Sequence, residues 1–246
     1  MLAIVVTFLG SLVAGYLGAA LGLVLGTLRL PILLLAADTT AAGAGTNIAI
    51  SAAAAAAGSL RHAREGRVDW RIVAWMAPPS VAGAVAGGLL GGELPERLLL
   101  AGVAAVLAWQ GFDLVARPFH EQPVERPRAV PAAAFGVVIG FVGGALGVIL
   151  GTLRMPALLR AVGLTAARAA GTNLVVGFLL GIAGFAAHAA KLEVDWALLP
   201  AGVAGALPGA WLGAHVTGGL SEETLRRAIG VALLAISVVF AVGAAR

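Results

Sequence analysis

The sequence predicts an all-α polytopic membrane protein made of two homologous halves, and three observations lead to this prediction. Of the 246 residues, 60% are hydrophobic and only 11% are charged, whereas soluble domains carry about 25% charged residues. Several long stretches contain no Asp, Glu, Lys or Arg, and each is close to or beyond the ~20 residues that cross a bilayer core. The third observation is an internal repeat that duplicates most of the chain. The charge-free stretches are residues 1–28, 39–60, 72–92, 129–153, 169–190, 196–221 and 228–245.

The composition also excludes several classes of function. The chain has no Cys, so disulfides, thiol chemistry and Cys-based metal sites are excluded. It contains no H-E-x-x-H pair, no G-x-S-x-G turn and no P-loop, which are common motifs of enzymes and nucleotide-binding proteins. We therefore expect neither an enzyme nor a metal or cofactor site. The net charge of +4 does not form a basic patch with interleaved aromatics, so we expect no nucleic-acid partner.

The internal repeat runs through both halves in the same order. Residues 20–31 (ALGLVLGTLRLP) recur as residues 145–156 (ALGVILGTLRMP). An A-G-T-N motif and a later V-D-W motif recur in the same way. We therefore predict a first membrane repeat over 1–117, a polar and proline-containing linker over 118–130, and a second membrane repeat over 131–246. The paired motifs are Ala44–Asn47 with Ala170–Asn173, and Val68–Trp70 with Val194–Trp196.

Each half begins with a glycine-rich segment that a proline interrupts, over residues 1–37 and 131–163. Proline removes a backbone donor and breaks the helical hydrogen-bond ladder, so we expect these segments to be broken helices. Three uninterrupted spans follow each broken segment. They are residues 41–60, 72–92 and 98–116 in the first half, and 169–190, 196–217 and 226–245 in the second.

The path of the broken segments determines how the halves are related. If each segment crosses the bilayer, the halves are parallel four-span repeats; if each is a re-entrant hairpin, they are inverted repeats with three crossings. Cytoplasmic loops are enriched in Lys and Arg. With Arg29 and Arg154 left out, the hairpin arrangement places the basic residues on one side, except Arg97, Lys191 and Arg246. We therefore favour inverted repeats with both termini outside, in the plasma membrane of a bacterium.

The candidate substrate site lies in the broken segments. A charged side chain at the bilayer centre costs about 2.5–3.5 kcal/mol on insertion scales, yet Arg29 and Arg154 occupy the same repeat position, two residues before a proline. Guanidinium groups suit planar oxyanions, so we predict that both bind one anion near the midplane. The alternative is that each Arg reaches the interface or caps carbonyls freed by the proline. The expected additional donors are Thr27, Thr152, Thr46, Asn47, Thr172 and Asn173.

Two repeated histidines and two repeated aspartates lie at the ends of predicted spans. His62 and His188 could couple transport to protons, or they could be interfacial residues. Asp69 and Asp195 each precede a Trp at the start of a span. Helix capping by Asp and interfacial placement of Trp explain that pattern without a functional role.

The duplicated motifs resemble the sulfite exporter TauE/SafE family. The resemblance covers nearly the whole chain and implies a plasma-membrane permease for small sulfur-containing or organic anions, such as sulfite, sulfoacetate or related sulfonates. The chain departs from the family pattern at the candidate site, where Arg precedes each proline and where Asn47 and Asn173 replace a serine. The matching segments are residues 22–33, 43–48 and 68–70, and residues 147–158, 169–174 and 194–196.

These observations predict a secondary transporter that exports small oxyanions by alternating access. An anion that leaves a negative-inside cell moves down the electrical gradient by about 2.3 kcal/mol per 100 mV, so export needs no ATP-binding domain. An anion channel and a non-transporting membrane scaffold or subunit are the alternatives. The expected partners are a small anion, the lipid bilayer and a second copy of the chain in a homodimer.

Overall fold

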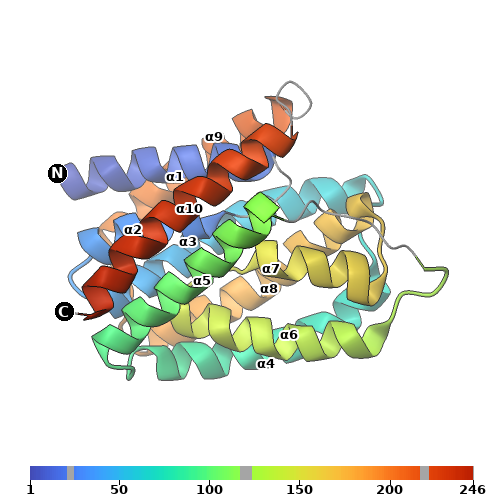
Figure 1. Ribbon diagram of the computed structural model, residues 1–246, viewed down its shortest axis with the longest axis horizontal. Coiled ribbons are helices and arrows are strands. Elements are labelled where there is room, and N and C mark those ends of the chain that lie inside the picture. The colour runs from blue at the N-terminus through green and yellow to red at the C-terminus, as the bar shows by residue number, and fades with distance from the viewer. Residues whose placement is uncertain (21–24, 117–123, 217–221, 246) are drawn as a thin grey trace.

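The computed structural model describes residues 1–20, 25–116, 124–216 and 222–245. These residues form ten α-helices and one π-helical turn, with no strand among them. The all-α prediction is therefore confirmed. Figure 1 shows a bundle of helices that run mostly along the long axis of the molecule.

The first broken segment forms two helices, α1 (Leu2–Ala20) and α2 (Gly26–Ala36). Residues 21–24, which include the predicted Gly22 of the repeat, lie outside the described residues. Gly10 in the middle of α1 faces Ile32 of α2, and a methyl group on Gly10 would lie 2.3 Å from the Ile32 Cδ1. The chain therefore returns along α1 after the break (Figure 1).

The second broken segment forms α6 (Ala129–Leu146), α7 (Gly151–Pro156) and the π-helical turn η1 (Ala157–Val162). α6 ends at Gly147 in the left-handed conformation, with φ +66°, where a methyl group would lie 2.2 Å from the Ala44 carbonyl oxygen. Only glycine accommodates both the dihedral and the close contact. The segment returns to the end at which it begins, because the Arg128 amide donates to the Val162 carbonyl at 2.9 Å.

Residues 118–123 of the predicted linker lie outside the described residues. α6 begins at Ala129, two residues before the predicted start of the second repeat at residue 131. Ala129 is the first residue after Arg128 in an apolar stretch, so the helix starts as soon as the charges end.

Three longer helices follow each broken segment, as the spacing of charge-free stretches predicts. The Asp69 carboxylate accepts from the Ile72 amide at 3.1 Å, and the Asp195 carboxylate accepts from the Leu198 amide at 3.0 Å. The capping interpretation of both aspartates is thus confirmed. The helices are α3 (Thr40–Arg64), α4 (Trp70–Gly91) and α5 (Glu96–Ala116), then α8 (Ala166–Ala190), α9 (Leu198–Val216) and α10 (Glu222–Ala245).

Six helices in the described part of the chain are long and apolar enough to cross a membrane, namely α1, α4, α5, α6, α8 and α10. Their outward surfaces are apolar, with exposed residues such as Val5, Phe141 and Val239. A multi-pass membrane protein follows from these helices.

Helices of one half pack against those of the other half in a reciprocal pattern. α1 packs on α9, and the equivalent α6 packs on α4; α3 packs on α8, and α5 on α10. Glycines bring the backbones together: a methyl group would lie 2.1 Å from the Phe141 carbonyl oxygen at Gly87, and 2.2 Å from the Leu12 carbonyl oxygen at Gly209. Small residues allow such close helix contacts in membranes. Each half therefore packs equivalent helices against equivalent partners in the other half.

The two ends of the bundle differ in charge. Figure 1 shows the N- and C-termini at one end, whereas α5 ends and α6 begins toward the other. The Arg168 guanidinium lies 3.5 Å from the Asp69 carboxylate, so the start of α8 and the start of α4 share this second end. We call it the arginine-rich end. Its described basic residues are Arg61, Arg64, Arg67, Arg71, Arg126, Arg128, Arg160, Arg168 and Arg227.

Candidate functional site

The antiparallel pair α3 and α8 forms the centre to which the candidate residues attach. A methyl group on Gly58 would lie 3.1 Å from Leu174, one on Gly181 would lie 2.9 Å from the Ala52 Cβ, and one on Gly184 would lie 2.5 Å from Ile48. Residues 48 to 58 of α3 therefore lie opposite residues 184 to 174 of α8. This register shows which residue of α8 lies opposite each residue of α3.

Arg29 lies on α2 and binds to α3. Its side chain is 2% exposed. The Nε donates to the Asn47 Oδ1 at 3.0 Å, and one terminal nitrogen donates to the Asn47 carbonyl at 3.1 Å and to the Ser51 hydroxyl at 2.6 Å. The other terminal nitrogen makes no hydrogen bond to the described residues, so it is available to a ligand. The Asn47 amide donates to the Gly147 carbonyl at 2.8 Å and so links this cluster to the second half.

Arg154 occupies the equivalent position on α7 but is less completely bonded. It is fully buried, and one terminal nitrogen donates to the Asn173 Oδ1 at 2.9 Å and to the Asn173 carbonyl at 3.1 Å. Its Nε and its other terminal nitrogen have no partner among the described residues. The repeat explains the difference, because Gly177 stands where the first half has Ser51. Buried polar groups are almost always bonded, so these two nitrogens indicate a place for an additional acceptor.

The two guanidinium groups belong to separate clusters. Arg29 binds at the level of Asn47 and Ser51 on α3, which lies opposite the stretch of α8 near Gly181 and Gly184. Arg154 binds at Asn173, opposite Gly58. The structure therefore brings each Arg to the Asn of its own half. That both Arg side chains bind one anion stays a prediction.

The four candidate threonines divide into two types. The Thr27 and Thr152 hydroxyls are buried and have no hydrogen-bond partner in the described ranges. The Thr46 hydroxyl donates to the Ala42 carbonyl at 2.7 Å and accepts from the Asp195 amide at 2.8 Å.

Thr172 forms the reciprocal contact, since its hydroxyl accepts from the Asp69 amide at 2.9 Å. Thr46 and Thr172 thus join each half to the start of a helix in the other half. Both hydroxyls accept a hydrogen bond in that contact, and their role as ligand donors stays a prediction.

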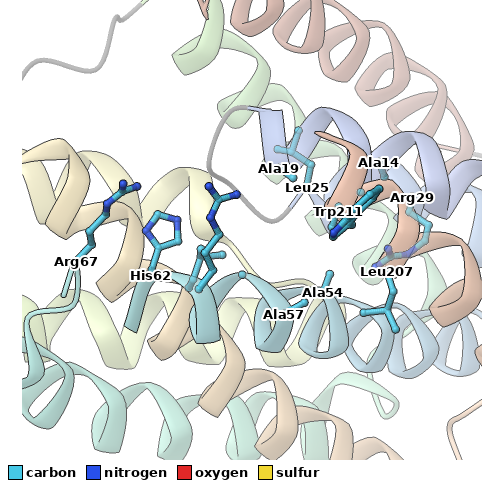
Figure 2. Close-up of a pocket in the computed structure, with 16 residues that line it drawn as sticks. Ala14, Ala19, Leu25, Arg29, Ala54, Ala57, His62, Arg67, Leu207 and Trp211 are labelled. Carbon is cyan, nitrogen blue, oxygen red and sulfur yellow. The ribbon is translucent and has the colours of Figure 1, made fainter. Parts of the chain in front are cut away.

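A cavity of about 340 Å³ leads from the arginine-rich end to Arg29. Figure 2 shows Arg67 and His62 at one end of this cavity and Arg29 at the other, with Ala54 and Ala57 of α3 between them. Its walls come from α1, α2, α3, α8 and α9 and from the loop after α3. The charged or titratable side chains that line it are all basic: Arg29, Arg61, His62 and Arg67.

An acidic side chain bridges two of the basic residues at the mouth of the cavity. The two carboxylate oxygens of Glu65 lie 3.1 Å from the Arg61 Nε and 3.1 Å from a terminal nitrogen of Arg67. The hydrogen bond from Arg61 lowers the pKa of Glu65, which lies in the turn after α3, so this carboxylate stays charged at neutral pH.

The two candidate histidines have different surroundings. His62 lines the cavity, and its Nδ1 has no partner among the described residues. His188 is fully buried; its Nε2 lies 2.9 Å from the Gly144 carbonyl oxygen and its Nδ1 lies 2.8 Å from the Glu193 Oε2. Glu193 corresponds in the repeat to Arg67, so one His faces an acidic residue where the other faces a basic one.

Comparison with known proteins assigns the chain to a family. The sequence profile described as sulfite exporter TauE/SafE matches residues 7–240. The chain belongs to the TauE/SafE family. It is 25% identical over 237 residues to "Probable membrane transporter protein YjnA" of Bacillus subtilis, a match that covers 89% of this chain and 90% of the relative.

Other relatives carry similar names. A "Probable membrane transporter protein" of Xylella fastidiosa (strain Temecula1 / ATCC 700964) is 27% identical over 241 residues, with 91% of this chain and 90% of the relative covered. "Probable membrane transporter protein YdhB" of Bacillus subtilis is 26% identical over 236 residues, with 93% and 95% covered. No solved structure matches the chain. The chain therefore belongs to a family of membrane transporters, as the resemblance of its motifs implies.

Several residues of this TauE/SafE site were not predicted from the sequence, among them Arg61, Glu65 and Arg67 at the mouth of the cavity. In addition, Ser51 binds Arg29, Trp211 lines the cavity, and Glu193 contacts His188. The repeat alignment contains a usable signal for Ser51 and Glu193, because Ser51 pairs with Gly177 and Glu193 pairs with Arg67. Such differences inside an otherwise matching repeat indicate where the two halves make different side-chain contacts.

Proposed function

We propose that the protein is a secondary transporter that exports small sulfur-containing or organic oxyanions, such as sulfite or sulfonates, across the bacterial plasma membrane. The observation that supports this most strongly is the cavity that ends at Arg29. Ligand sites typically combine an apolar wall with a few convergent polar groups, and here the charged and titratable lining groups are all basic. An anion that enters at Arg61 and Arg67 meets the unbonded nitrogen of Arg29 at the inner end.

Arg154 supplies the second step of this proposal. Two of its nitrogens and the Thr152 hydroxyl are buried without partners in the described chain, so an oxyanion there would satisfy groups that are otherwise costly to bury. Because Arg29 bonds to Asn47 of α3 and Arg154 bonds to Asn173 of α8, they bind the anion in turn in our proposal. Asn47 and Asn173 position the two guanidiniums through the bonds already described.

An inverted arrangement of the halves supports alternating access. Both broken segments return toward the end at which they begin, and the N- and C-termini lie at the end opposite the start of α6. With the arginine-rich end in the cytoplasm, as the charge bias favours, the cavity opens inward. The broken segments then act as re-entrant hairpins, whose irregular backbone is acceptable where it lines a cavity.

Anion flux in reconstituted vesicles tests the proposal. Replacement of Arg29 by Gln removes the charge at the inner end of the cavity but keeps a hydrogen-bonding side chain. We expect flux of sulfite or a short sulfonate to fall by roughly 30-fold or more, since removal of one partner of a buried charged contact costs at least 2 kcal/mol. Unchanged flux in a folded R29Q protein would reject this site.

The same vesicles distinguish a carrier from the alternative of an anion channel. A carrier that holds its substrate in an occluded state shows accelerated exchange when unlabelled anion is present on the far side. A channel shows electrical conductance without such counterflow. The cavity ends at Arg29 among the described residues, which favours the carrier.

A further inference from the structure

The two halves contain the same crevice in two states. In the first half, Ala19, Ala54, His62 and Ala210 line the open cavity. The repeat pairs them with Gly144, Leu180, His188 and Ala84 in the second half. All four of these counterparts are buried, so the second crevice is closed.

Close helix contacts explain why the second crevice is closed. A methyl group on Gly144 of α6 would lie 2.2 Å from the Ala84 carbonyl oxygen of α4, and one on Gly91 would lie 2.4 Å from the Ala145 carbonyl oxygen. In the first half, α1 and α9 touch at Gly15 and Ala206. A methyl group on Gly15 would also lie 3.1 Å from the Ala210 nitrogen of α9, and Ala19, one turn further along α1, lines the cavity.

In the closed crevice, His188 of α8 contacts both the Gly144 carbonyl of α6 and the Glu193 carboxylate. A carbonyl oxygen accepts only, so the Nε2 of His188 must carry a proton and donate to Gly144 of α6 at 2.9 Å. The Nδ1 and the Glu193 Oε2 are 2.8 Å apart, and one proton must lie between them because two lone pairs would repel at this distance. The closed crevice therefore holds one proton more than a neutral imidazole with a free carboxylate.

Three helices pack around His188, and a glycine of each helix approaches it. Gly45 of α3, Gly88 of α4 and Gly144 of α6 approach it without any charge. The charged groups are Glu193 and, on the neighbouring loops, the ion pair of Lys191 with Glu93. Asp195 caps α9.

We infer that His188, Glu193 and the Gly144 carbonyl form a proton-binding latch that holds the second crevice shut. This inference rests on the proposed alternating access but concerns a different site. When the crevice opens, α6 moves away from His188, water reaches the pair, and the shared proton passes to water, leaving a neutral imidazole and a carboxylate. High pH therefore opens the latch and low pH closes it. The first half lacks this dependence because Arg67 replaces the carboxylate.

Cysteine labelling tests the latch without any measurement of transport, because the natural chain has no Cys. A54C reports on the open cavity and L180C on the closed crevice, at equivalent positions of the repeat. Both variants are purified and treated with a small methanethiosulfonate at pH 6 and pH 9. The ratio of the L180C rate to the A54C rate cancels the general effect of pH on thiol reactivity. We expect this ratio to rise by at least tenfold between the two pH values.

Variants of the latch complete the test. In E193Q the Gln amide can donate to Nδ1 without a shared proton, so the ratio should stay low at both pH values; in H188A it should be high at both. A ratio that does not change with pH in the unaltered latch, or a high ratio in E193Q at pH 6, would overturn the inference. If L180C fails to fold, the pair A84C and A210C gives the same comparison. Failure of the latch leaves Arg29-dependent flux untouched, and loss of that flux leaves the labelling result valid.

Discussion

Replacement of each buried Arg by Met should separate a ligand-binding role from a structural one. Arg29 makes three hydrogen bonds to α3, whereas Arg154 makes two to Asn173 and leaves two nitrogens without partners in the described chain. A hydrogen bond to a charged group contributes about 1.5–3 kcal/mol, and an unsatisfied buried group costs about 1–3 kcal/mol. Removal of Arg154 therefore loses fewer hydrogen bonds than removal of Arg29, and it also removes two buried nitrogens that have no partner in the described chain.

We expect the ligand-free R154M protein to be more stable than the R29M protein by about 3 kcal/mol. Replacement of a buried charge by an apolar side chain is often neutral or stabilising, so R154M should unfold at or above the wild-type temperature while it no longer transports anions. A difference of 3 kcal/mol corresponds to roughly 6–12 °C in a protein of this size.

Thermal unfolding of the purified variants in the same detergent measures this difference, and each variant serves as the control for the other. If R154M is destabilised as much as R29M, then Arg154 stabilises the break before Pro156 as a structural cap. The second binding step at Arg154 would then have to be abandoned.

Three further predictions concern the mouth of the cavity, the Lys191–Glu93 ion pair and the packing of α4 against α6. E65Q should lower the anion concentration for half-maximal flux, because Arg61 and Arg67 lose their internal partner; a higher concentration would contradict this. Lys191 lowers the pKa of Glu93 by its hydrogen bond and charge. The pair therefore stabilises the protein above the ordinary pKa of Glu93, and the stability advantage of wild type over E93Q should disappear as the pH falls below the lowered value; an advantage that persists in acid would refute it. G87A, whose methyl group would meet the Phe141 carbonyl oxygen at 2.1 Å, should destabilise by about 1–3 kcal/mol, whereas G243A, with open space around it, should not; equal melting temperatures would refute the packing argument.

The sequence predicted the helices well because charge-free length determines them in a membrane. The ends of α4 and α9 followed from Asp69 and Asp195, whose capping depends only on neighbouring residues. The pairing of the broken segments with α4 and α9 of the opposite half was not predictable, since glycines such as Gly87 and Gly209 indicate close packing without naming the partner helix.

The sequence singled out the two Arg residues of the candidate site but not the contacts that each of them makes. The repeat identified Arg29 and Arg154, and both are buried. Symmetry in the sequence suggested one shared anion point, which stays a prediction, and the structure shows that each guanidinium bonds to the Asn of its own half. The state of each crevice could not be predicted either, because equivalent positions such as Ala54 and Leu180 take different environments within one conformation.

Protection of the cavity by an anion is the most direct test of the central claim, that an oxyanion binds at the inner end beside Arg29. A single Cys at position 54 lies in the cavity wall between the mouth and Arg29. We predict that sulfite or a short sulfonate slows the reaction of A54C with a neutral maleimide, and that the same anion has no effect when A54C is combined with R29Q. Equal protection with and without Arg29, at the same anion concentration, would contradict the account.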